Sequence, residues 1–320
     1  MARSEQAAPP LPSGPWTSGL GVLIDMAPQP TDGTLGLSYV DSLRDVVAVP
    51  MEGSTAELQI TQHHQDVRIE STVWPAAIAM ASNMPAIVAG AFACSSMGQC
   101  CVLELGAGTG VGACAAAAHG ALLAIATDLP SCMAACEMNA RAFAQDRGWQ
   151  DISATLPTTV CGWMATPGEN HDDDHHHQPQ LLLTMPLDWS NLPAWDELVS
   201  ASKSRLPEFA EGLLRTLRPS HATLAPPAPQ PTCTPPSWLV LAAECVYSDT
   251  PSLDFTRMCS DLVQARGMRM LLAYRRRLPA AEVPIWQAIA ALGCVCQHAP
   301  AQKYYGAADE GCWLVALSAE

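Results

Sequence analysis

The sequence has few basic residues. Of its 320 residues, 16 are Lys or Arg and 31 are Asp or Glu, so the formal net charge is −15. A phosphate backbone is held mainly by Lys and Arg, and this scarcity therefore argues against nucleic acid as a primary partner. The acidic balance better suits a basic segment of another protein.

The sequence also lacks paired cysteines and long apolar runs. Its 13 cysteines include no C-x-x-C pair, which favours reduced, buried thiols in an intracellular compartment over a disulfide framework. No run of 18 or more apolar residues is free of turn-forming residues, so we predict no membrane span and no membrane partner. The first 16 residues resemble neither a signal peptide nor a transit peptide. We therefore expect a cytoplasmic protein, with the nucleus as the alternative.

The most informative stretch of the chain is 100–130. An apolar run over 101–105 leads into glycines at alternate positions, then a helix of small residues and a second apolar run that ends at Asp128. This order predicts a strand, a tight turn, a helix, a strand and an acid. Glycine lets the backbone turn sharply and a ligand approach closely, and a carboxylate about 20 residues later can accept both hydroxyls of a ribose. The stretch predicts a nucleoside-cofactor site.

One glycine of the dinucleotide fingerprint is missing from this stretch. The fingerprint is G-x-G-x-x-G, and Val111 stands at its third glycine. We expect the carboxylate of Glu104 to point into the pocket, where it would repel a pyrophosphate and favour a cationic ligand. S-adenosylmethionine carries a sulfonium, an amino-acid end and a ribose, and it needs no phosphate cradle. The alternative is a glycine-rich turn of an unrelated α/β protein.

Predicted strands and helices alternate along the chain, which indicates a mainly parallel α/β sheet with helices on both faces. The last two strands, 294–298 and 312–317, are joined by a short connection, so we expect them to be antiparallel. Alternating apolar and polar residues over 58–60 and 67–69 predict a β-hairpin. A helix with a capping hydroxyl is predicted to begin around Pro75 and to be kinked or ended by Pro85.

A single folded domain is expected over 37–320, after a disordered tail rich in Pro and Gly at 1–36. Two long insertions, at about 148–180 and 190–236, interrupt this domain. The first contains a run of three Asp and three His, which can bind a divalent metal but is more often a solvated loop.

Two cysteines are also spaced as metal ligands on a helix could be. Cys132 and Cys136 stand at i and i+4, yet no other ligand candidates lie nearby in sequence, and we expect both to face the core. We therefore predict no metal site.

Six blocks of sequence, in this order along the chain, resemble methyltransferase family 16, the seven-strand protein-lysine methyltransferases. The blocks are TVWPAA at 72–77, VLELGAGTGVGA at 102–113, TDLP at 127–130, LDW at 187–189, AAECVY at 242–247 and LLAYRRR at 271–277. The resemblance implies a Rossmann-like, seven-stranded class I methyltransferase sheet with an antiparallel edge hairpin and an N-terminal β-hairpin extension. It also implies S-adenosyl-L-methionine as cofactor.

The reaction implied by the resemblance is methylation of a lysine side chain on a non-histone protein, such as a chaperone or a translation factor. We expect a monomeric enzyme. Two alternatives stay open. One is a methyltransferase of the same fold that acts on another residue or a small molecule, and the other is a non-catalytic, cofactor-binding interaction protein whose insertions form its working surface.

Single residues are given roles by the same resemblance. Those expected to bind the cofactor are Trp74 beside it, Glu104, Gly106, Ala107 and Gly108 at its methionine end, Asp128 at the ribose, Asp188 and Trp189 at the adenine, and Ala243 in the pocket wall. The catalytic pair next to the target nitrogen is Glu244 and Tyr247. The first position of this pair is often Asp in the family, and the Glu244 side chain is one methylene longer than that of Asp.

Overall fold

The computed structural model describes twelve stretches of the chain, and every structural statement below concerns these residues. They are 17–18, 45–51, 57–62, 71–92, 96–156, 158–165, 180–190, 237–245, 252–275, 285–289, 295–300 and 312–319. No helix within them combines the length and the hydropathy that a membrane span requires.

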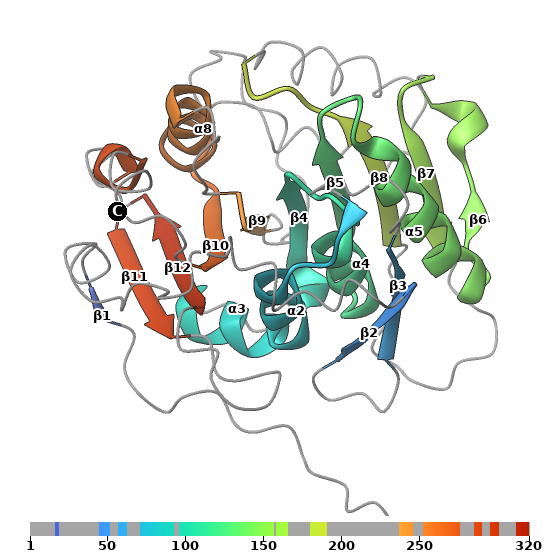
Figure 1. Cartoon of the computed structure of the whole chain (residues 1–320), viewed down its shortest axis with the longest axis horizontal. Helices are drawn as coiled ribbons and strands as arrows, with labels where there is room; N and C mark the ends of the chain where they lie inside the picture. Colours follow the sequence, from blue (N-terminus) through green and yellow to red (C-terminus); the bar gives the residue numbers. More distant parts are fainter. Residues whose placement is uncertain are drawn as a thin grey trace, which may run out of the picture.

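The centre of the described structure is one sheet, whose ten strands run in the order β1-β11-β12-β10-β9-β4-β5-β8-β7-β6 (Figure 1). The strands are β1 (Thr17–Ser18), β4 (Cys100–Leu105), β5 (Leu123–Asp128), β6 (Gln150–Asp151), β7 (Cys161–Ala165), β8 (Gln180–Pro186), β9 (Ser237–Ala243), β10 (Arg269–Arg275), β11 (Val295–Pro300) and β12 (Cys312–Ser318). Strands β8, β5, β4, β9 and β10 are parallel. The mainly parallel α/β sheet is therefore confirmed.

The predicted edge hairpin is also confirmed, because β12 runs antiparallel to both of its neighbours, β10 and β11. The strands from β11 to β8 contain this hairpin and the parallel strands. Three further strands extend the sheet: β1 pairs with β11 at one edge, and β7 and β6 continue from β8 at the other in antiparallel pairs.

Helices cover both faces of the sheet, and the strand side chains alternate between them. Val102 and Ala124 join the core on the side of α2 (Pro75–Ser82), α4 (Val111–Ala118) and α5 (Met133–Asp146). Their neighbours Leu103 and Ile125 join the core on the side of α8 (Ser252–Cys259) and its π-helical continuation η6 (Ser260–Ala265). The central strands β4 and β5 bury apolar side chains on both faces, as expected for a sheet between two helical layers.

An N-terminal hairpin packs on the first of these layers. It consists of β2 (Val46–Pro50) and β3 (Glu57–Thr61), which are antiparallel. An N-terminal hairpin is present, but it is not the one predicted: the partner of β3 lies upstream of it, and the expected partner at 67–69 lies outside the described residues. The alternation that identifies β2 is short, and it ends at Pro50, which cannot donate to a ladder.

Two α-helices lie in the described chain between this hairpin and the sheet. Helix α2 begins after Trp74 with Pro75 in its first turn and ends at Ser82, and α3 (Met84–Phe92) follows with Pro85 in its own first turn. The predicted interruption is confirmed. The predicted capping hydroxyl is wrong, because the N-cap residue is Trp74 and its side chain makes no capping hydrogen bond. Proline has no N–H that would need such a cap. A short 3-10 turn, η4 (Met97–Gln99), then leads into β4.

The structure describes 148–156, 158–165 and 180 of the first predicted insertion. After α5 come β6, the 3-10 turn η5 (Ser153–Thr155) and β7, whose Trp163 is 1% exposed. The Asp and His tract falls in 166–179, outside the described residues, as does all of 191–236. Of the predicted tail at 1–36 the structure describes Thr17–Ser18, which pair with β11, and the rest of that prediction stays a prediction.

We expect Trp163→Ala to lower the free energy of unfolding by about 3–5 kcal/mol, because it removes a large side chain from a packed core. Urea denaturation measures this change. Gln150→Ala, at an exposed position of the neighbouring β6, is the control and should stay within about 0.5 kcal/mol of the parent. A loss below about 1 kcal/mol for Trp163→Ala would contradict its placement in the core.

Candidate active site

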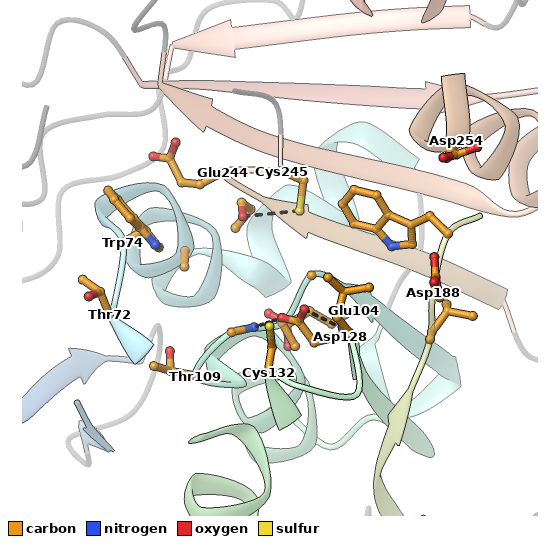
Figure 2. Close-up of a pocket in the computed structure, with 18 of the residues that line it drawn as sticks. Thr72, Trp74, Glu104, Thr109, Asp128, Cys132, Asp188, Glu244, Cys245 and Asp254 are labelled. Atoms are coloured by element: carbon orange, nitrogen blue, oxygen red, sulfur yellow. Dashed lines mark hydrogen bonds between the residues drawn. The ribbon is translucent and has the colours of Figure 1, made fainter. Parts of the chain in front are cut away.

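A cavity of about 340 Å³ opens at the carboxyl ends of the central parallel strands (Figure 2). Its described lining residues are Thr72, Trp74, Ala77, Glu104, Gly106, Ala107, Gly108, Thr109, Asp128, Leu129, Cys132, Leu187, Asp188, Trp189, Ser190, Ala243, Glu244, Cys245 and Asp254. This edge is where open α/β sheets hold their ligands. Ten of the eleven residues singled out in the sequence lie around this one cavity, and the eleventh, Tyr247, lies outside the described residues.

Glu104 lines the cavity from the end of β4, and its carboxyl group accepts hydrogen bonds from the first turn of helix α4. Its Oε1 accepts the N–H of Gly112 at 2.9 Å and its Oε2 accepts the N–H of Ala113 at 2.8 Å. The side chain is 2% exposed. Burial raises the pKa of its carboxyl to about 7, although the two backbone N–H groups act to lower it and the charge of Asp128 raises it further.

This geometry changes the prediction for Glu104. Its carboxylate was expected to point at the ligand, whereas it binds the first turn of α4. The N–H groups that a pyrophosphate would use at a helix N-terminus are therefore already engaged. A Cβ on Gly112 would lie 2.5 Å from Oε1 of Glu104, so this glycine is what allows the carboxylate to reach the helix.

The glycine turn is fastened to the end of β5 by Asp128. The Oδ2 atom of Asp128 accepts the N–H of Gly108 and its Oδ1 accepts the N–H of Leu129, both at 2.7 Å. Gly106 has φ +60°, and a Cβ there would lie 2.8 Å from Sγ of Cys245. Asp128 therefore holds the glycine turn against the end of β5, at the wall of the cavity.

One end of the cavity is formed by the segment that follows β8 and by helix α8. The Oδ1 atom of Asp188 accepts two hydrogen bonds from Ser190, one from the backbone N–H at 2.9 Å and one from the hydroxyl at 2.7 Å. These bonds lower the pKa of the Asp188 carboxyl. The Trp189 ring packs on Phe255 of α8, with 5.2 Å between ring centroids. Asp254 of the same helix also lines the cavity. No sequence motif pointed to Asp254, because its helix was not predicted.

Glu244 has an unusual backbone conformation at the end of β9. Its φ is +58°, and no other non-glycine residue in the described part of the chain has a positive φ. Its N–H donates to the carbonyl of Ala273 on β10 at 2.7 Å, and the residue is 5% exposed. In Figure 2, Glu244 and Trp74 lie toward one side of the cavity, and Asp188 and Asp254 lie toward the other. Such a left-handed residue persists only where its surroundings hold it, often at functional sites.

The charges around the cavity are of one sign. Five residues with carboxyl side chains line it, namely Glu104, Asp128, Asp188, Glu244 and Asp254, and its described lining includes no Lys, Arg or His. Of the two cysteines at helical spacing, Cys132 lines the cavity, whereas Cys136 is buried beneath Gly110. Within the described ranges, no three His, Cys, Asp or Glu residues gather as metal ligands would.

The sheet order, the glycine turn and the position of the cavity define a Rossmann-like fold of the methyltransferase class. Residues 53–163 match the model of the lysine methyltransferase family, which confirms the resemblance drawn from the sequence blocks. The matched region contains β3, α2, the glycine turn and Asp128, and it ends in β7. A search of curated proteins finds no match. The fold, the site and the family together support a methyltransferase enzyme.

Glu104→Gln tests the buried carboxyl at α4. The pKa of Glu104 is raised from 4.5 to about 7 in the folded protein, so its contribution to stability is fully present below about pH 4.5 and is lost as the pH rises through about 7. We expect the free energy of unfolding of the parent, minus that of the variant, to fall by about 3 kcal/mol over this interval. Urea denaturation of both proteins across the interval measures this. A difference that is independent of pH would refute the raised pKa.

Proposed function

We propose that this chain is an S-adenosyl-L-methionine-dependent methyltransferase that methylates a lysine side chain of a non-histone protein. The observation that carries the proposal is the charge of the cavity, whose described lining has five carboxyl groups and no basic side chain. A sulfonium, the amino group of the methionine end and the ammonium of lysine are all cations. Opposite charges within about 4–6 Å favour one another, and phosphate groups would be repelled.

The residues around the cavity fit this cofactor. Its volume, about 340 Å³, lies within the range of about 300–1,000 Å³ that is usual for small-molecule sites. Asp128 lines the cavity as the acceptor for the ribose hydroxyls, and the Trp189 ring offers an aromatic face for the adenine. Glu104 occupies the helix N–H groups that a dinucleotide would need. When bound, S-adenosylmethionine supplies a methyl group on a positively charged sulfur.

The protein's own part in the reaction is to align the acceptor and exclude water. Lysine has a reference pKa of about 10.4 and must lose a proton before its nitrogen can attack. Burial and a neighbouring positive charge both lower the pKa of an amine. In this proposal Glu244, at the end of β9, orients the lysine nitrogen and takes its proton on a carboxylate oxygen, while Trp74 borders the channel through which the lysine enters. The role of Tyr247 in catalysis is the one that the resemblance implies.

The substrate belongs, in this proposal, to proteins with basic segments, because the chain carries a net charge of −15 and charge complementarity speeds encounter. Chaperones and translation factors are the candidates that the family resemblance offers. We propose a cytoplasmic or nuclear enzyme that acts as a monomer.

Glu244→Ala should leave the affinity for S-adenosylmethionine unchanged and lower turnover about 100-fold, the usual scale for one positioned acid–base group. Calorimetry and a methyl-transfer assay measure the two quantities. Alanine disfavours a positive φ as glutamate does, so the backbone preference at this position is little changed. Asp146→Ala, which removes a carboxylate that is 82% exposed on α5, controls for the loss of one charge. Normal turnover in Glu244→Ala would make Glu244 a structural residue.

Incubation of a cell lysate with tritiated S-adenosylmethionine and the protein tests the substrate class. We expect one labelled protein band, and mass spectrometry of that band should locate the methyl group on lysine. Asp128→Ala should give no label and no calorimetric binding while its circular dichroism is unchanged, because the ribose acceptor is lost.

The other outcomes of the labelling are equally informative. Label on histidine or arginine, or in small molecules alone, would assign another acceptor to the same fold. Cofactor binding without any label would favour a non-catalytic protein. A parent protein that does not bind S-adenosylmethionine would overturn the proposed cofactor.

A further inference from the structure

A single buried amide joins the N-terminal hairpin to the glycine turn. Asn139 lies on α5 and is 2% exposed. Its Nδ2 donates to the carbonyl of Thr61 at 3.1 Å and to that of Thr109 at 3.0 Å, and its Oδ1 accepts the N–H of Thr61 at 2.9 Å. Thr61 is the last residue of β3, whereas Thr109 lines the cavity. Both donors of this side chain and one of its acceptor sites are therefore used to connect the two segments.

The next residue of the hairpin makes a second connection, to another wall of the cavity. Gln62 is 4% exposed, and its Oε1 accepts the N–H of Val73 at 2.8 Å. Val73 stands between Thr72 and Trp74, which both line the cavity. The backbone N–H of Gln62 donates in turn to the carbonyl of Asp45, at the start of β2, at 2.7 Å.

The end of β3 is thus bonded to two walls of a cavity that the described hairpin residues do not line. Thr109 lies within the glycine turn, and Trp74 precedes the first residue of α2. A buried hydrogen-bonding group tolerates the loss of its partner poorly. A shift of the hairpin must therefore break these bonds or move both walls with it.

We propose that Asn139 and Gln62 are positioning residues, through which the N-terminal hairpin sets the two walls of the cofactor cavity. This inference rests on the proposed cofactor. The hairpin then contributes to cofactor binding although its described residues do not line the cavity. Because coupling between two sites is reciprocal, a ligand that orders the cavity walls must also order the hairpin.

Amide hydrogen exchange of the intact protein, with and without S-adenosylhomocysteine, tests the coupling directly. Exchange should slow on binding in the lining segment 106–109 and also in β3, although β3 does not line the cavity. This comparison needs no variant. Protection that is confined to lining residues would overturn the inference.

Asn139→Ala should lower the affinity for S-adenosylhomocysteine about 10–100-fold, within the usual range for coupled sites, and should abolish the ligand-dependent protection of β3. Gln62→Leu should lower the affinity too and abolish the ligand-dependent protection of 72–74. Calorimetry gives the affinities, and thermal denaturation gives the stability of each variant.

Phe143→Ala is the matched control for a purely structural effect. Phe143 lies one turn along α5 from Asn139, is also buried, and packs on Trp149 with 5.5 Å between ring centroids. This variant should lose stability and yet keep both the affinity and the protection of β3.

Two results would overturn the inference alone: normal affinity in Asn139→Ala, or an equal loss of affinity in Phe143→Ala. Failure of the parent protein to bind S-adenosylmethionine and S-adenosylhomocysteine would instead overturn the proposed function, and the inference with it.

Discussion

The bond between Glu104 and the first turn of α4 is the interaction on which the cavity depends. A carboxylate at the end of the central strand meets two backbone N–H groups at a helix N-terminus, where negative charge is favoured. This contact sets the distance between β4 and α4, and the glycine turn must cross that distance. Within the turn, the N–H of Gly108 donates to Asp128. Carboxyl groups of the protein itself therefore join the strand, the turn and the helix. A site built in this way has no use for a phosphate, and its remaining charge favours cations.

Much of this arrangement could be predicted from the sequence, because the contiguous parts of the fold carry their own signals. The apolar runs before Glu104 and Asp128 predicted adjacent parallel strands, and the carboxyl ends of such strands meet at one edge. The cluster of predicted site residues follows from that rule. The short connection between the last two strands likewise predicted their antiparallel pairing.

Other features were missed because they depend on packing between distant segments. The direction of the Glu104 side chain follows from where α4 begins in space, which spacing does not reveal. Strand β7 was assigned to an insertion, although it pairs with β8 and its Trp163 belongs to the hydrophobic core. Helix α8 has no motif, yet it brings Asp254 to the cavity. The partner of β3 was sought downstream, since the alternation in 67–69 is closer in sequence than that in β2.

The left-handed backbone of Glu244 has a consequence for the balance between stability and activity. A non-glycine residue in this region carries a penalty of about 1–2 kcal/mol, which a glycine at the end of β9 would avoid. The fold would therefore be more stable with glycine there, but without a carboxyl group at this end of the cavity. This protein retains glutamate, so the burial of apolar side chains in the two layers over the sheet must offset the backbone penalty at this position. Selection for thermal stability alone would tend to remove Glu244.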